Sequence, residues 1–294
     1  MRTGEERQLH RLEKIVALAA LAAVLALAVG FAQAREPAGE GDRLFLRSAA
    51  ALVQDAASGE TLYAKNHSAV VPIASITKLM TALVIVESGV DLAQRVVISD
   101  EDYDTVKGTR SRLRAGSVFT RDELLLLALM ASENRAAAAL GRTYPGGTEA
   151  FVAAMNARAR LLGMADTRFV DASGLSPANV SSAHDLARLV AAASAHPLIR
   201  EYSTRERALV HVFGRPQEFR NTNGLVRNGD WDIGLSKTGY IAEAGRCLVM
   251  RVRMASRDLI VVLLDSWGKY SRLGDAARIR KWLETSSAAR GARG

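Results

Sequence analysis

Two pairs of residues in the chain place a serine three positions before a lysine. Ser75 and Lys78 lie in "VPIASITKLMTALVIVESG", where an apolar run becomes helical. Ser266 and Lys269 enclose a glycine after an expected strand, so we interpret that pair as part of a loop. Residues i and i+3 share one face of a helix, so the amine of Lys78 can reach the hydroxyl of Ser75. The first pair therefore predicts a serine nucleophile with a lysine as its base.

A lysine can act as a base for serine only if its pKa falls, through burial or a nearby cation. Lys237 in "SKTGY", at the end of an expected strand, is the candidate second cation. Ser132 and Asn134 in "ASENRAAAAL" lie between two expected helices and add a hydroxyl and an amide. Free backbone N–H groups at the helix start near Ser75 can stabilise an oxyanion. Taken alone, Ser75 could be a helix cap, Ser132 and Asn134 could form a turn, and Lys237 could be a surface charge. Together the three motifs favour an enzyme that catalyses acyl transfer.

The chain resembles the penicillin-recognising serine enzymes in three motifs, which are Ser75-x-x-Lys78, Ser132-x-Asn134 and Lys237-Thr238-Gly239. Within that group it is similar to the D-alanyl-D-alanine endopeptidases of the penicillin-binding protein 7 type. The closer similarity lies in "YPGG", "NARARLLGMADTRFVDASGLSPANVSSAHDLARL" and "AGRCLVMRV". It extends from about Ala50 to Glu284.

The resemblance implies a role for each motif residue. Ser75 would be the acylated nucleophile and Lys78 its general base. Ser132 would relay a proton to the leaving amine, and Asn134 would hold the peptide amide of the substrate. Lys237 and Thr238 would bind the carboxylate beside the scissile bond, and Gly239 would let the strand approach the substrate closely. The backbone N–H groups of Ser75 and Tyr240 would form the oxyanion hole.

The resemblance also implies a substrate and an inhibitor class. The enzyme would cleave D-Ala to diaminopimelate crosslinks in peptidoglycan through an acyl-enzyme, and β-lactam antibiotics would acylate it. A DD-carboxypeptidase that removes terminal D-Ala is the first alternative, although only 55 residues follow Gly239, which leaves no room for the extra domain and anchor of many related carboxypeptidases. A β-lactamase is disfavoured because no Glu-x-x-Leu-Asn lies around "DASGLSPAN". A catalytically silent wall-binding protein is disfavoured by the intact motifs.

Other chemistries have little support in the sequence. There is no Gly-x-Ser-x-Gly elbow and no His-Glu-x-x-His zinc motif, and "GLSKTG" lacks the glycine that a phosphate loop needs before its lysine. The histidines after the amino-terminal region show no ligand spacing; they are His67, His184, His196 and His211. The sequence therefore implies no metal and no cofactor.

The charge of the chain bears on its partners. Lys and Arg number 39 and Asp and Glu 31, so the formal net charge is +8. The basic residues are scattered and have no interleaved aromatic residues, which disfavours nucleic acid as a partner. An acidic wall polymer fits better, as does peripheral association with an anionic membrane surface. The single cysteine, Cys247, excludes an internal disulfide and is expected to be a small buried hydrophobe.

The amino-terminal pattern predicts export. Residues 1–34 contain a basic stretch, the apolar run Ile15–Phe31 and the small-residue site Ala32-Gln33-Ala34, as in a signal peptide cleaved after Ala34. The rival interpretation is an uncleaved anchor. We expect a periplasmic protein with a flexible lead at 35–49, a catalytic domain at 50–286 and a disordered tail at 287–294.

The expected elements predict an α+β fold. Strand-like runs form a hairpin around Ala57–Gly59 and a longer hairpin around Ala255–Arg257. Helices are expected from Pro72 to about Glu87, at the chain end, and after three cap residues, which are Thr120, Thr148 and Ser182. An antiparallel sheet built from both chain ends, covered by helices and with an inserted helical subdomain, accounts for this order. The active site is then expected between the sheet and the helical subdomain.

Overall fold

The computed structural model describes residues 44–291, with side chains to residue 286. The expected signal peptide, its cleavage site and most of the expected lead lie outside the described residues. Within them, no helix combines the length and apolar character needed to cross a membrane. The folded unit begins at Leu44, and Leu46 is already buried, so the last residues of the expected lead belong to the fold.

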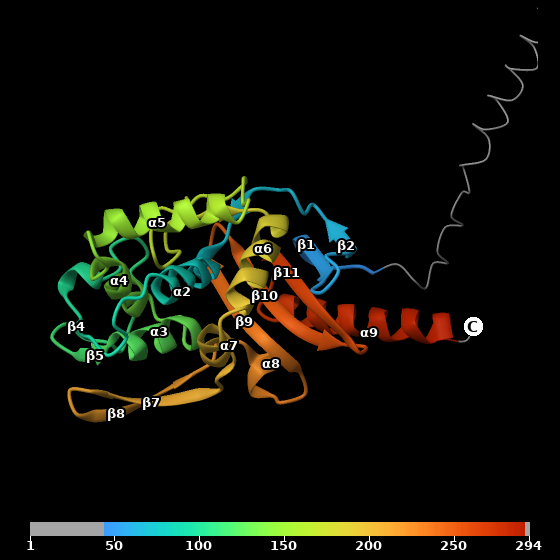
Figure 1. Cartoon of the computed structure of the whole chain (residues 1–294). Helices are drawn as coiled ribbons and strands as arrows, with labels where there is room; N and C mark the ends of the chain where they lie inside the picture. The colour runs from blue at the N-terminus through green and yellow to red at the C-terminus, as the bar shows by residue number, and fades with distance from the viewer. Residues whose placement is uncertain (1–43, 292–294) are drawn as a thin grey trace, which may run out of the picture. The chain divides into compact units, whose positions relative to one another are not determined.

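The main sheet of the described chain is antiparallel and joins strands from both ends of the chain (Figure 1). Its order is β2-β1-β11-β10-β9. The bounds of these strands are β1 Ser48–Asp55, β2 Thr61–Lys65, β9 Asp232–Ile241, β10 Gly245–Met254 and β11 Arg257–Ser266. The central pairing is β1 with β11, where Leu52 lies opposite Val262. The predicted sheet built from both chain ends is therefore confirmed.

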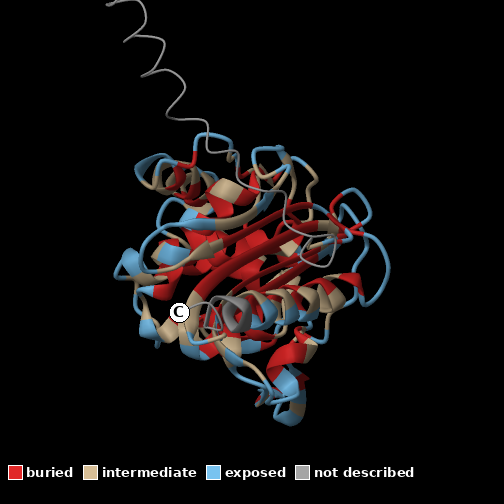
Figure 2. Cartoon of the chain, turned by 90° about the vertical axis from the view of Figure 1, so that its right-hand side faces the viewer, coloured by how far each residue is buried: buried red, intermediate tan, exposed pale blue. Residues whose placement is uncertain are grey.

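Both faces of this sheet are buried, because each packs against helices. Along β11, Val261 and Leu263 pack with Ile279 of α9 (Ser271–Gly291), whereas Ile260 and Val262 face the other way. The opposite face is covered by α6 (Ala183–Ser194). Figure 2 shows the buried strands in red, with exposed residues on the outer side of the helices. Burial on both faces explains why these strands are apolar runs without alternation.

The remaining elements form the helical block and its connections. The helices are α2 Lys78–Glu87, α3 Arg121–Met130, α4 Asn134–Arg142, α5 Gly147–Leu161, α7 Pro197–Thr204 and α8 Gly224–Arg227, with short 3₁₀ turns η2 Ala74–Thr77 and η3 Asp100–Asp102. The small strand pairs are β3 Val71–Pro72 with β6 Val180–Ser181, β4 Arg95–Val97 with β5 Val118–Thr120, and β7 Arg207–Val212 with β8 Arg215–Arg220. The inserted helical subdomain thus lies between β2 and β9 in the chain.

The predicted start at Pro72 is wrong, because Pro72 ends strand β3 and α2 begins only at Lys78, after the 3₁₀ turn η2. The three predicted cap residues agree with the structure at two positions. Thr120 caps α3 in a capping box with Glu123, and Ser182 accepts a hydrogen bond from the backbone of Asp185 at the start of α6. The prediction for Thr148 is wrong, because the cap residue of α5 is Gly146, which lies two residues earlier and has no side-chain cap. Gly146 and Gly147 both have positive φ, +86° and +77°, a conformation that glycine adopts without steric cost.

Helix α9 is longer than expected. It continues to Gly291 and so includes residues 287–291, which the sequence assigns to a disordered tail. Residues 292–294 lie outside the described residues. Cys247 is a free, buried thiol in β10, as predicted, and burial raises its pKa to about 11.

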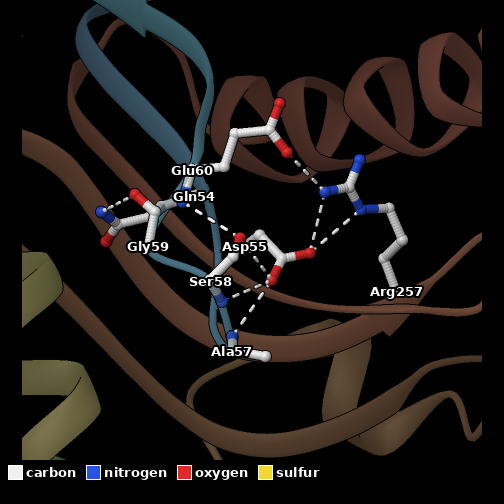
Figure 3. A network of polar contacts seen from close by, with 7 residues as sticks. All are labelled: Gln54, Asp55, Ala57, Ser58, Gly59, Glu60 and Arg257. Atoms are coloured by element: carbon white, nitrogen blue, oxygen red, sulfur yellow. Dashed lines mark hydrogen bonds and ion pairs between the residues drawn. The ribbon is translucent and has the colours of Figure 1, made fainter.

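The turn between β1 and β2 is tied to the turn between β10 and β11 (Figure 3). The carboxylate of Asp55 accepts hydrogen bonds from the backbone of Ala57 and Ser58, and Arg257 donates to both Asp55 and Glu60. These hydrogen bonds lower the pKa of Asp55 to about 2. The network fixes the edge of the sheet far from the motif residues, and we assign it a structural role.

Candidate active site

Helix α2 and the turn before it position the first motif. Nearly the whole of α2 is buried, and the turn η2 carries Ser75 at the boundary between the helical block and the sheet. Ala74, just before it, has φ +47°, a conformation that is unfavourable for a residue with a Cβ. Gly174 packs directly against the carbonyl of Ala74, where no side chain would fit. The backbone before Ser75 is therefore held in a strained shape by its neighbours.

The amine of Lys78 has three hydrogen-bond partners. Its Nζ lies 2.8 Å from Ser75 Oγ, 2.7 Å from Asn134 Oδ1 and 2.5 Å from the carbonyl oxygen of Ser173. Two of these partners can only accept, because they are amide and carbonyl oxygens. A neutral amine has two N–H groups and one lone pair. If the two N–H groups donate to the oxygens of Asn134 and Ser173, the lone pair faces the Ser75 hydroxyl. This is the arrangement required of a base that removes the serine proton.

The electrostatics of Lys78 fit the same arrangement. The side chain is fully buried, and this desolvation lowers its pKa to about 7, although Asp171 and Glu133 act in the opposite direction. Burial also lowers the pKa of Lys237 well below its ordinary value, and the charges of Lys78 and Arg272 lower it further. The sequence predicts that burial or a nearby cation lowers the pKa of Lys78; in the structure burial is the main cause.

The second motif lies in the connection between α3 and α4. Ser132 has φ +57°, the left-handed conformation that commonly ends a helix and favours glycine. A serine in this conformation costs on the order of 1 kcal/mol, yet its Oγ lies 2.8 Å from Lys237 Nζ. Asn134 opens α4 and donates from Nδ2 to Thr109 Oγ1, which directs its Oδ1 towards Lys78. The turn thus aims a hydroxyl and an amide at the two lysines.

The third motif lies in the middle of β9 rather than at a strand end, which corrects the sequence prediction. Lys237 is buried and donates to the carbonyl of Thr238 at 2.9 Å. The hydroxyl of Thr238 lies 2.6 Å from that of Thr222, a partner that the sequence did not suggest. Strand β9 is the edge of the main sheet, so no strand of that sheet pairs with one side of its backbone. Edge strands of this kind can receive an extended peptide.

The direction of the β9 backbone follows from its contacts. The N–H of Ser236 donates to Ser203 on the side away from β10, and the carbonyl of Thr238 accepts from Lys237 on that same side. Backbone groups alternate in direction along a strand, so the N–H of Tyr240 also faces away from β10. Tyr240 therefore presents an N–H group at the free edge, as an oxyanion donor would have to.

Gly239 brings β9 against the turn that carries Ser75. A Cβ added at Gly239 would lie 2.8 Å from the carbonyl oxygen of Ile73, 3.2 Å from the Ala74 Cβ and 3.2 Å from the Ser75 nitrogen. The family resemblance implies that this glycine lets the strand approach the substrate closely. In the structure Gly239 packs against the backbone around Ser75. Because it has no side chain, the first and third motifs can lie close together.

The loop 171–179 supports Lys78 and was not assigned a role from the sequence. Asp171 accepts hydrogen bonds from the backbone of Ser173 at 2.6 Å, of Gly174 at 2.6 Å and of Ser176 at 3.0 Å, and from the side chain of Asn179 at 2.7 Å. These bonds shape the loop so that the Ser173 carbonyl reaches Lys78. The run "DASGLSPAN" is rich in turn-forming residues, which was the available signal.

The structure separates the two serine and lysine pairs. Ser266 is buried and bonds to Ser48, which in turn donates to Asp275, while Lys269 lies over the ring of Tyr270. The two side chains therefore have other partners. The loop interpretation fits Lys269, which lies in a turn, but not Ser266, which is the last residue of β11. Among the described residues, no group of three or more His, Cys, Asp or Glu side chains is placed to hold a metal ion.

Comparison with known proteins gives concordant similarities. A profile of the D-alanyl-D-alanine carboxypeptidase family matches residues 38–268. A D-alanyl-D-alanine endopeptidase of Pseudomonas aeruginosa is 49% identical over 82% of this chain and 78% of its own length, and one of Escherichia coli is 44% identical over the same shares. A solved D-alanyl-D-alanine carboxypeptidase of Mycobacterium tuberculosis superposes with a TM-score of 0.74 at 27% identity, covering 84% of this chain and 94% of that one.

Proposed function

Since this chain belongs to the D-alanyl-D-alanine carboxypeptidase family, we propose that it is a serine DD-endopeptidase that cleaves D-Ala to diaminopimelate crosslinks in peptidoglycan through an acyl-enzyme. The observation that carries the proposal is the contact of Ser75 Oγ with Lys78 Nζ at 2.8 Å, with the other two partners of that amine obligate acceptors. The names of the two relatives above 40% identity support the endopeptidase assignment over the wider family.

The acylation step uses the first motif. Lys78 takes the proton of the Ser75 hydroxyl as Oγ forms a bond to the carbonyl carbon of D-Ala. The carbonyl oxygen becomes an oxyanion, which the N–H groups of Ser75 and Tyr240 stabilise. The tetrahedral intermediate collapses when the C–N bond breaks and Ser132 relays to the departing amine the proton that Lys78 took from Ser75, which leaves Lys78 neutral and the Ser132 hydroxyl intact. Water then hydrolyses the Ser75 ester and restores the hydroxyl.

Substrate binding and base activation are coupled through the two lysines. The carboxylate next to the leaving amine would bind Lys237 and Thr238, and its negative charge favours the protonated form of Lys237. A charged Lys237 then disfavours protonation of Lys78, since each cation lowers the pKa of the other. Asn134 would bind the peptide amide of the substrate through its Nδ2 group. Binding of the correct substrate therefore keeps the base neutral when it is needed.

A DD-carboxypeptidase is the second candidate, favoured by the name of the matching family and by the Mycobacterium tuberculosis structure. In both reactions the leaving amine carries a neighbouring carboxylate, so the same pocket serves. Purified protein incubated with crosslinked and monomeric muropeptides separates the candidates. An endopeptidase converts the crosslinked dimer to monomers, whereas preferential release of free D-Ala from the pentapeptide monomer would support the carboxypeptidase.

The remaining expectations belong to the same proposal. As a penicillin-binding enzyme the protein would form a covalent adduct with β-lactams and release it slowly, whereas rapid turnover would indicate a β-lactamase. The amino-terminal pattern supports export to the periplasm, with cleavage after Ala34. Peripheral association with the membrane is proposed from the basic charge of the chain. Fractionation of cells expressing the full chain, with mass measurement of its mature amino terminus, tests both points.

A further inference from the structure

A hollow of about 500 Å³ lies between the β7–β8 hairpin and the segment before β5. Its arginines are Arg112 and Arg114 on one side and Arg215 on the other. At the tip of the hairpin, the ring of Phe213 contacts the opposite segment, since a Cβ on Gly116 would lie 3.7 Å from its Cζ. Figure 1 shows the hairpin running beneath α3 towards β5. The hollow is therefore bounded by two segments about 100 residues apart in the sequence.

The three arginines differ in their contacts with the described side chains. Arg112 stacks on Phe219, with its guanidinium carbon 3.7 Å from the ring centroid, and donates to the carbonyl of Glu218 at 2.5 Å. Arg114 and Arg215 are exposed, and among the side chains that the structure describes, residues 44–286, neither guanidinium makes a hydrogen bond or an ion pair. Free guanidinium groups bind carboxylates in pairs of parallel hydrogen bonds. The hollow thus offers two uncompensated positive charges to an anionic ligand.

The hollow adjoins the catalytic motif on the side of the leaving group. Ser111, which lines it, donates to the carboxylate of Glu133 at 2.8 Å, and Glu133 lies between the two residues of the second motif. Ser132 contacts Lys237, and these are the groups that the proposed mechanism assigns to the departing amine and its carboxylate. A ligand in the hollow would therefore belong to the part of the substrate that leaves.

We propose that Arg114 and Arg215 bind carboxylates of the second stem peptide of a crosslinked substrate, the peptide released as the amine. This inference rests on the proposed function. A monomeric pentapeptide releases a single D-Ala, whose only carboxylate is used at Lys237 and Thr238, so nothing of it reaches the hollow. A crosslinked dimer releases a whole stem peptide with further carboxylates. The hollow therefore favours crosslinked over monomeric substrates.

The test compares substitutions on the same hairpin. Arg215→Gln removes a charge from the hollow at the hairpin tip, whereas Arg207→Gln removes one at its base, which lines a different surface. Two exposed ion pairs are worth roughly a tenfold change in binding together. The Arg114→Gln, Arg215→Gln double variant should lose about tenfold in kcat/KM for the crosslinked dimer, mainly through KM. Hydrolysis of the monomer and acylation by penicillin should not change.

The outcomes are distinguishable from failure of the proposed function. The role of the hollow would be overturned if the ratio of kcat/KM for the dimer to kcat/KM for the monomer were unchanged in the double variant. It would also be overturned if Arg207→Gln lost as much kcat/KM for the dimer as the double variant does. A dimer in which the second-stem carboxylates are amidated, except the one beside the leaving amine, should be cleaved equally by parent and double variant, and a persisting difference would also overturn the role of the hollow. Absence of dimer cleavage and of penicillin labelling in the parent protein would instead reject the proposed function.

Discussion

The pH dependence of acylation follows from the burial of Lys78, whose pKa is lowered to about 7. Only the neutral amine can take the Ser75 proton, so the rate rises with pH as Lys78 deprotonates. About half of the enzyme has a neutral Lys78 at pH 7, about 1% at pH 5 and nearly all at pH 9. We expect the acylation rate constant to fall about fiftyfold from pH 7 to pH 5 and to level off above pH 8.

Single-turnover acylation by a fluorescent penicillin measures this rate constant directly, because the labelled protein is quantified before any ester is hydrolysed. Near-ultraviolet circular dichroism at each pH verifies that the protein stays folded. An inflection near the ordinary lysine value of about 10.4 would refute the reasoning, as would a flat profile between pH 5 and pH 9, because either would mean that burial does not keep Lys78 neutral.

The same pKa shift has a consequence for stability. Between about pH 7 and pH 10 the unfolded chain binds a proton at Lys78 that the folded chain does not, so the free energy of unfolding rises with pH across this window. A Lys78→Met variant lacks this dependence. Its stability relative to the parent protein should therefore fall by about 2 kcal/mol from pH 7 to pH 9 in urea titrations. A constant difference would contradict the shift.

Three further predictions follow from contacts in and around the site. Gly239→Ala would push a Cβ against Ile73 and should slow acylation on the order of a hundredfold. On the same strand, the added Cβ of Gly234→Ala meets no atom closer than 3.8 Å, so the acylation rate should be unchanged. Equal effects of the two substitutions on the acylation rate would contradict the packing argument. Asp171→Asn removes the charge that orders the loop beneath Lys78 and should lower the melting temperature by about 4 °C or more. An unchanged melting temperature in calorimetry would contradict this role of Asp171. Cys247 should react with a thiol reagent only in denaturant, because its pKa is raised by burial; rapid modification of the native protein would disprove this.

The local patterns of the sequence predicted the fold well because they depend on neighbouring residues. The two hairpins, the α3 capping box and the Ser182 cap all have their partners within a few positions along the chain. The three motifs could likewise be recognised from short strings, and the structure brings them together through Lys78 and Lys237. That the sheet is built from both chain ends also followed from the position of the apolar runs, whereas the strand order came from the structure.

The features that the sequence did not reveal depend on contacts between distant segments. Thr222 meets Thr238 only because a connecting segment folds beside β9. The sequence of β8 gives little sign of a strand, since it contains Pro216 and three charged residues without an apolar alternation. The arginine hollow joins Arg114 and Arg215, whose charges look scattered in the sequence. The main cause of the Lys78 shift, its complete burial, required the packed structure.

The central claim is that Ser75 is the nucleophile, and intact-mass measurement of penicillin-treated protein tests it most directly. The parent protein should gain the mass of one penicillin, and peptide mapping should locate it on Ser75. Ser75→Ala should gain no mass, whereas Ser266→Ala, in the second serine and lysine pair, should be labelled as the parent is. A full penicillin adduct on Ser75→Ala would contradict the account.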